Sequence, residues 1–361
     1  MWKERLREHR RQLHRIPEVG DDLPRTKEYL LKVLSGLDCE IIPVMDSGLL
    51  AYFDGGKEET LAFRGDMDGL PIEEKTGRDY GSTHQGKMHA CGHDGHMAMV
   101  LTLAEYVNKK TLPYNILIVF QPAEETVGGA SNIVDTGIFE RVNTKAVFGF
   151  HLWPFSSKGE ISTMPGPMMN MSSEVTGRVL GKTAHAGNAH EGIDALEVMV
   201  EFLADVYHMP KKGILRIGMV SGGTARNVLA DDVIFKGTLR ALRVEDYEEM
   251  KKGVLQLQRK WEEQTGAKIT FDLSRPYLPV TNDPVMYSRM KPILDEEGVK
   301  LMEAPLTIAE DFSAYQRAAP SMFFLLGTGA GISLHSDNFD FDEDILERGF
   351  DFYKKIIEEY E

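Results

Sequence analysis

Apolar segments of strand length alternate with segments of helical periodicity through the first 150 residues, and this alternation limits the folds open to the chain. The strand-length apolar runs lie at residues 49–53, 60–63, 115–120 and 146–150. Apolar residues repeat with helical spacing over residues 2–16, 29–37 and 96–107. Strands that alternate with helices favour a largely parallel sheet that is covered on both faces. We therefore predict an α/β protein with a mixed, largely parallel sheet and helices on both faces.

The alternation stops near residue 170, and a different pattern takes its place. Residues 165–170 (PGPMMN) are rich in helix and strand breakers, which predicts a hinge. Residues 174–273 then have the order strand, helix, strand, strand, helix, strand, which is typical of a split βαβ unit. The chain of 361 residues is long enough for two domains. We expect one domain of residues 1–171 and 282–361, with an α+β domain of residues 172–281 inserted into it.

Charge and composition exclude several classes of protein. The chain has 41 basic and 56 acidic side chains, and its net charge of −15 disfavours a nucleic-acid or anionic-membrane partner. Its two cysteines, Cys39 and Cys91, are too few for a disulfide framework, and Cys39 is most simply a buried core residue. The start of the chain has no apolar region of a signal peptide, and no run of 18 apolar residues occurs. We expect a cytoplasmic protein.

Histidines are concentrated in one short segment. Four of the 11 histidines fall between residues 84 and 96, around the sequence HACGHDGH at 89–96. Cys91 and His93 are two residues apart in an extended segment, so they can point the same way, just before a helix for which Asp94 is the expected N-cap. Thiolate and imidazole are usual ligands of zinc and similar ions. The alternative is a loop with surface histidines and a small buried cysteine.

Two adjacent glutamates follow one of the predicted strands. Glu124 and Glu125 come directly after the apolar run that ends at residue 120. The carboxyl ends of parallel strands are where open α/β sheets place their sites. A metal hydrolase needs one carboxylate on the metal and a second to take a proton from the attacking water, and adjacent glutamates can divide these tasks. They could equally be solvated surface charges.

Two more histidines belong to the candidate metal site. His151 closes another apolar strand, and His335 lies in a polar loop late in the chain. Each alone is more typical of a structural residue. With Cys91, His93 and Glu125 they make five ligands, which are more than one closed tetrahedral site needs and suit two adjacent ions.

With these motifs in order, the chain resembles the dinuclear-metal amidohydrolases of the aminoacylase and carboxypeptidase superfamily. The most similar branch holds bacterial N-acyl-amino-acid amidohydrolases, hippurate hydrolases, N-acetyl-diaminopimelate deacetylases and auxin-conjugate hydrolases. The resemblance covers nearly the whole chain, and the segments that carry it are 14–18 (HRIPE), 64–72 (RGDMDGLPI), 91–94 (CGHD), 121–125 (QPAEE), 149–151 (GFH), 181–187 (GKTAHAG), 222–228 (GGTARNV), 237–240 (GTLR) and 310–312 (EDF).

The resemblance implies a zinc-exopeptidase-like fold and a role for each matching residue. The residues that match the family's metal ligands are Cys91, His93, Glu125, His151 and His335. Cys91 matches the bridging position and Glu124 the general base and acid. Two divalent ions per subunit are implied, with zinc or manganese favoured over nickel or cobalt. The inserted domain is implied to act as a lid and to carry the interface of a homodimer or tetramer.

Three residues of the inserted domain match positions that act on the substrate. His185 matches a histidine that stabilises the oxyanion, and Asn227 and Arg240 match positions that hold the substrate's carboxylate. Taken alone, His185 could be a surface histidine and Arg240 a solvated charge. The family usually has a proline at the position of Ala189, so the rigidity of this loop is an open question.

Other polar residues have two interpretations. Asp66, Asp68 and Asp311 could cap turns or could orient a metal ligand, and we favour the second for Asp68. The glycine-rich segment 326–331 lacks the Lys-Ser/Thr of a phosphate loop, so we interpret it as backbone that lies close to the substrate.

The predicted function is hydrolysis of the amide bond of N-acyl-L-amino acids, a small-molecule substrate, with Glu124 as general base and acid. The alternatives are an N-acetyl-diaminopimelate deacetylase of lysine biosynthesis and a non-catalytic metal-binding protein on the same fold. A nicotinamide-dependent oxidoreductase would need a Gly-x-Gly-x-x-Gly after the first strand, which this sequence lacks.

Overall fold

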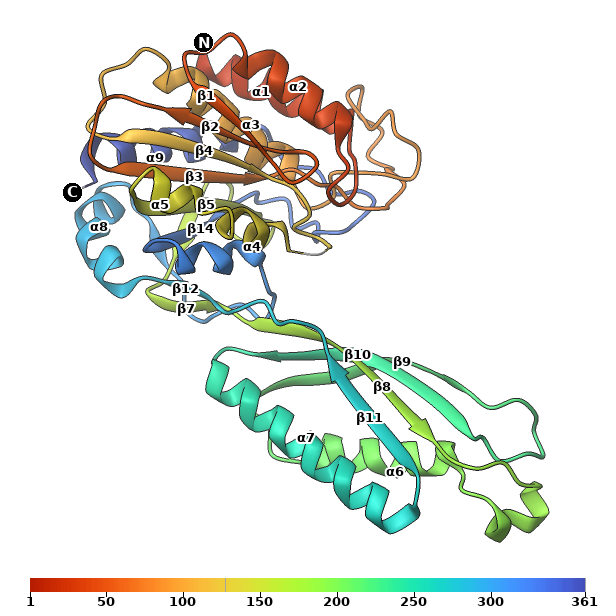
Figure 1. Cartoon of the computed structure of the whole chain (residues 1–361). Coiled ribbons are helices and arrows are strands. Elements are labelled where there is room, and N and C mark those ends of the chain that lie inside the picture. The colour runs from red at the N-terminus through yellow and green to blue at the C-terminus, as the bar shows by residue number, and fades with distance from the viewer. Residues whose placement is uncertain (127, 361) are drawn as a thin grey trace. The chain divides into compact units, whose positions relative to one another are not determined.

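The computed structural model describes residues 1–126 and 128–360, which fall into two compact units (Figure 1). Unit 1 consists of Met1–Met168, Thr281–Ala304 and Asp311–Glu361, and unit 2 of Met169–Val280 and Pro305–Glu310. The segment Pro305–Glu310 was expected in the first domain. It groups with unit 2 because its backbone pairs there: Leu306 forms a parallel bridge with Met169, and the Asn170 N–H donates to the Ile308 carbonyl at 2.9 Å.

Unit 1 is built on an eight-stranded sheet in the order β1-β2-β4-β3-β5-β14-β6-β13. Its strands are β1 (Glu40–Val44), β2 (Gly48–Phe53), β3 (Thr60–Asp66), β4 (Asn115–Gln121), β5 (Thr144–Trp153), β6 (Ile161–Thr163), β13 (Lys300–Leu301) and β14 (Ser321–Gly327). The four central strands β4, β3, β5 and β14 are parallel to one another, while β1–β2, β2–β4 and β14–β6 pair antiparallel. The predicted mixed, largely parallel sheet is confirmed.

Helices cover both faces of this sheet, as the alternation predicted. The helices of unit 1 are α1 (Trp2–His14), α2 (Pro24–Leu34), α3 (His93–Val107), α4 (Gly129–Val134), α5 (Ile138–Arg141), α8 (Pro284–Glu296) and α9 (Ile345–Glu359), with the 3₁₀ helix η2 (Asp311–Arg317). On β5, Phe150 packs against Phe352 and Tyr353 of α9. Its neighbour Gly149 points to the other face, where a Cβ atom would lie 2.7 Å from the ring of Phe312 in η2.

The predicted N-cap of α3 is wrong. The helix begins at His93, and its N-cap is Gly92 in the left-handed conformation at φ +87°. Asp94 lies inside the first turn, where its Oδ2 accepts hydrogen bonds from Arg10 Nε at 2.9 Å and His14 Nδ1 at 2.8 Å. Two buried side chains of α1 therefore hold the carboxylate that could otherwise cap the helix.

Unit 2 has its own sheet and its own core. Four antiparallel strands in the order β11-β8-β10-β9 are covered on one face by two helices (Figure 1). The elements are β8 (Met171–Leu180), η1 (Ala186–Glu191), α6 (Ala195–His208), β9 (Gly213–Gly222), β10 (Asp232–Ala241), α7 (Val244–Thr265) and β11 (Lys268–Leu273). Two short strands, β7 (Gly166–Met169) and β12 (Val280–Asn282), pair where the chain leaves and re-enters unit 1.

None of the described helices has both the length and the apolar character needed to cross a membrane.

Candidate metal centre

The five predicted metal ligands all lie in unit 1, at the ends of its central elements. Cys91 precedes α3, and His93 is the first residue of that helix. Glu125 follows β4, His151 lies near the end of β5, and His335 is in the loop after β14. Because parallel strands place their carboxyl ends at one edge of the sheet, residues far apart in sequence meet there.

The ligand atoms of these residues form two groups that share Cys91. One group is Cys91, His93 and His151, the other is Cys91, Glu125 and His335, and within each group the atoms lie within 4.8 Å of one another. Cys91 Sγ lies 3.4 Å from His151 Nε2, and His335 Nε2 lies 3.1 Å from Glu125 Oε1. Two groups with a common sulfur are an arrangement that can hold two neighbouring ions.

The hydrogen bonds of the imidazoles leave Nε2 for a ligand role. His93 donates from Nδ1 to the Asp68 carbonyl at 2.8 Å, and His151 donates from Nδ1 to the Leu152 carbonyl at 2.7 Å. Each bond orients its ring so that Nε2 lies in the ligand cluster, where a metal ion would bind the deprotonated nitrogen.

Two buried atoms at the centre of the cluster fit a cation. Among the described residues, His93 Nε2 and Glu125 Oε1 make no hydrogen bond. Their contacts are ion-pair distances, from His93 Nε2 to Asp66 Oδ2 at 3.4 Å and from Glu125 Oε1 to His335 Nε2 at 3.1 Å. Buried polar atoms rarely lack a hydrogen bond, since the lost hydration costs free energy. A set of one thiol, three imidazoles and a carboxylate is chemically suited to divalent transition metals.

The pKa values of three ionisable side chains in the cluster are shifted by burial and by neighbouring charges. Burial, with Glu125 and Glu124 nearby, raises the pKa of the Cys91 thiol. Burial would lower the pKa of His93, but Asp66, Asp68 and Glu125 outweigh it and raise that pKa to about 10. Burial would raise the pKa of Glu125, but His335 and His93 hold it below its ordinary value. The carboxylates thus concentrate negative charge that a cation would balance.

Asp68 connects the two segments that carry the site. Its Oδ1 accepts the backbone N–H of Glu124 at 3.0 Å, and its Oδ2 accepts that of Glu125 at 3.1 Å. Its own carbonyl accepts the bond from His93. Ala123, just before the two glutamates, has a left-handed backbone at φ +60°, which few non-glycine residues adopt. Asp68 therefore fixes the glutamate loop and the His93 ring together.

His96, the fourth histidine of the dense segment, is not available as a ligand. The Leu152 N–H donates to its Nε2 at 2.9 Å, and its Nδ1 donates to Asp66 Oδ1 at 2.6 Å. Both ring nitrogens are engaged, and burial lowers the pKa of His96, so the ring is neutral.

A buried polar network beneath the cluster was missed from the sequence. Arg64 of β3 donates to Asp66 at 2.7 Å, to Gln121 at 2.8 Å and to Asp311 at 3.0 Å. Tyr315 also donates to Gln121, at 2.9 Å. The available signal was an arginine directly after the apolar run at residues 60–63, because a buried charge needs a partner.

The three residues predicted to act on the substrate lie on unit 2, and they are His185, Asn227 and Arg240. Nδ1 of the exposed His185 accepts the Gly187 N–H at 3.1 Å, so its Nε2 carries the proton and can donate. Asn227 is exposed, and its carbonyl accepts the Ala186 N–H at 2.9 Å. Arg240 donates to Thr238 Oγ1 and to the Thr307 carbonyl, each at 3.3 Å.

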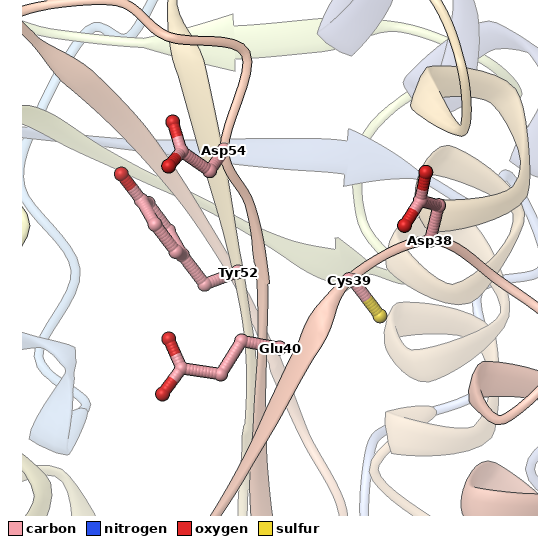
Figure 2. Close-up of a pocket in the computed structure, with 5 residues that line it drawn as sticks. All are labelled: Asp38, Cys39, Glu40, Tyr52 and Asp54. Atoms are coloured by element: carbon pink, nitrogen blue, oxygen red, sulfur yellow. The ribbon is translucent and has the colours of Figure 1, made fainter.

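A surface hollow elsewhere on unit 1 contains none of the predicted site residues (Figure 2). It is lined by Asp38, Cys39, Glu40, Tyr52 and Asp54. Glu40 and Tyr52 face each other across β1 and β2, and Cys39 points away from them toward the helices. Cys39 is half-buried rather than fully buried, and burial beside Asp38 raises its pKa to about 11. Its thiol therefore stays protonated at neutral pH and is no nucleophile.

Comparison with known proteins shows the family of the chain. The family model described as "Peptidase family M20/M25/M40" matches residues 62–359. The chain belongs to peptidase family M20/M25/M40. This M20 member is a metal-dependent amidohydrolase, and the predicted enzyme class and family resemblance are confirmed.

Relatives of this M20 protein match it over almost their whole length. An N-acetyldiaminopimelate deacetylase of Leuconostoc citreum is 31% identical, over 98% of this chain and 96% of its own. One of the same name from Listeria monocytogenes is 32% identical, over 97% of each chain. The Bacillus subtilis YXEP protein, a dinuclear metal-binding peptidase of family M20, has a structure with a TM-score of 0.87 at 27% identity, covering 99% of this chain and 97% of its own.

Proposed function

We propose that this M20 protein hydrolyses the amide bond of N-acyl-L-amino acids, releasing the free amino acid and a carboxylic acid. The observation that carries the proposal is the cluster of Cys91, His93, Glu125, His151 and His335 with Glu124 beside it. Several relatives are named N-acetyldiaminopimelate deacetylases, which makes N-acetyl-diaminopimelate the first substrate to test.

Each site residue has a proposed role in this reaction. The five ligands would hold two divalent ions, which would polarise the acyl carbonyl and lower the pKa of the attacking water. Glu124 takes the proton of that water and delivers it to the leaving amine nitrogen. Asp68 holds the backbone of both glutamates and is a positioning residue.

The residues of unit 2 act on the rest of the substrate. His185 donates from Nε2 to the oxygen that becomes negative in the tetrahedral intermediate. Asn227 and Arg240 hold the free carboxylate of the amino acid, where a guanidinium can form a charge-assisted hydrogen bond. The cysteine ligand favours zinc over magnesium or calcium, and manganese also suits a mixed nitrogen, oxygen and sulfur site.

Amine release from a panel of N-acyl amino acids tests the proposed function. With added zinc or manganese, we expect release from N-acetyl-diaminopimelate or another panel member, and loss of that activity on chelation. His93→Ala should abolish release and lower the bound metal measured by mass spectrometry, because it removes a buried ligand. His208 is exposed, so His208→Ala is the matched control and should change neither amine release nor the bound metal. Full release by metal-free protein would contradict the proposal.

We further propose that the protein is a homodimer that associates through unit 2. Strand β9 is at the edge of its sheet, and Met219 and Val220 on it are each 48% exposed. On α6, Leu196 and Val200 are also exposed. The end of α6 lies beside β9, since Tyr207 Oη accepts the Ile217 N–H at 2.9 Å. An exposed edge strand with apolar neighbours is suited to pairing with a second copy of itself.

A charge placed on this surface should separate the subunits. We expect Val200→Glu combined with Val220→Glu to shift the mass measured by light scattering from dimer to monomer, because association would bury both carboxylates. Leu301→Glu, at a 63% exposed position of unit 1, should leave the mass unchanged. A wild-type protein that is monomeric at micromolar concentration would contradict the proposed dimer.

A further inference from the structure

An aromatic pair follows His151 along the chain. Trp153 and Phe155 have their ring centroids 5.7 Å apart in an edge-to-face arrangement with an interplanar angle of 76°. Phe155 is 65% exposed, whereas Phe148 and Phe150 of the same segment are buried. We call Trp153 and Phe155 the aromatic rim.

Trp153 of the aromatic rim lies on the same side of β5 as the metal-ligand candidate His151. Alternate residues of a strand share a face, so His151 and Trp153 point the same way, about 7 Å apart along the strand. The register with β14 continues through His151 and Trp153, which pair with Leu325 and Gly327. Leu152, between them, is fully buried on the opposite face, where it lies against Gly92 at the start of α3.

Backbone hydrogen bonds fix the segment that carries the rim. The Thr328 N–H donates to the Trp153 carbonyl at 3.0 Å, and the Gly331 N–H donates to the Pro154 carbonyl at 3.1 Å. Gly329 donates to the Ser156 carbonyl, also at 3.1 Å, and has a left-handed backbone at φ +65°. The rim is therefore held in place, and binding an apolar group there would not require the loop to become ordered first.

We propose that the aromatic rim binds the apolar part of the substrate's acyl group and favours aryl or long-chain acyl groups over acetyl. This inference rests on the proposed function. In that proposal the acyl carbonyl lies at the metal ligands of unit 1, and Trp153 is two residues from one of those ligands, His151. A preformed edge-to-face pair offers an aryl ring or an alkyl chain a surface to pack against, and this contact removes apolar area from water.

The experiment compares kcat/KM for the N-benzoyl and N-acetyl derivatives of one amino acid. We expect Trp153→Ala with Phe155→Ala to lower the benzoyl-to-acetyl ratio by about thirtyfold relative to wild type, because the lost apolar contact acts on benzoyl alone. Trp153→Phe should keep most of the ratio. Leu301→Ala is the control for an equally exposed apolar residue elsewhere on unit 1.

A second measurement keeps the test independent of hydrolysis. Calorimetry on the metal-loaded Glu124→Gln protein compares binding of the same two compounds, with and without the rim substitutions. If wild type hydrolyses neither compound, the proposed function is wrong for these two substrates. Calorimetry then tests acyl binding by the aromatic rim without hydrolysis. If the preference for benzoyl is equal in rim-substituted and unsubstituted protein, the proposed role of the aromatic rim in acyl binding is wrong. A change of oligomeric mass with an unchanged preference also overturns it and assigns the aromatic pair to a subunit interface.

Discussion

Replacing Glu124 by glutamine should lower kcat by about a thousandfold while the bound metal stays at the wild-type level. Glutamine keeps the shape of the side chain but cannot accept the proton of the attacking water. KM should change little, since the substrate's carboxylate and acyl group are held by other residues. Rates from amine release, with metal content measured on the same samples, test this prediction.

The neighbouring glutamate provides the contrast. Glu125 Oε1 is buried 4.0 Å from His93 Nε2, and its position in the cluster predicts a ligand rather than a base. Glu125→Gln should therefore lose metal together with activity, whereas Glu124→Gln should lose activity alone. If Glu124→Gln kept more than a tenth of the wild-type kcat, or if the two variants lost metal equally, the division of roles between the glutamates would be wrong.

Most of the candidate metal ligands could be predicted from local sequence patterns, although they lie far apart in the sequence. The ligand candidates span residues 91 to 335, and all of them except His335 came from a short local pattern at the end of a predicted strand or before a helix. Local periodicity places strand ends, and parallel pairing then brings those ends to one edge. His151 and His335 had the weakest local signals, since each alone is more typical of a structural residue, and both were included because they complete a ligand set that suits two ions.

What the sequence missed depends on long-range partners. Asp94 has the residue type and place of an N-cap, but Arg10 and His14, about 80 residues away, take its carboxylate. Arg64 likewise finds Asp311 at a separation of 247 residues. Such pairings are set by how α1, β3 and η2 pack, and no periodicity in the sequence encodes them. Unit 2 was easier to predict because its strands alternate inward and outward side chains, as in the burial pattern of β8.

Replacing Arg64 by methionine should destabilise unit 1 by about 4 kcal/mol. Arg64 is 1% exposed, and its guanidinium is the cation between the buried carboxylates of Asp66 and Asp311. Without it, both carboxylates would face each other across a site that has lost its positive charge. Urea unfolding followed by circular dichroism measures the change, with the transitions of the two units fitted separately.

Arg141→Met is the matched control, because Arg141 makes an exposed ion pair with Glu40 at 3.3 Å. This variant should lose less than about 1 kcal/mol of unfolding free energy.

The destabilisation caused by Arg64→Met should also depend on pH. Burial would raise the pKa of Asp66, but Arg64 and the nearby histidines hold it well below its ordinary value. The stabilisation from this lowered pKa is present above the ordinary carboxyl pKa of about 4 and is lost below it. The difference in unfolding free energy between wild type and Arg64→Met should therefore narrow as the pH falls from about 5. A difference that stayed constant from pH 7 to pH 3, or that matched the control, would mean that Arg64 stabilises unit 1 through packing and not through its charge.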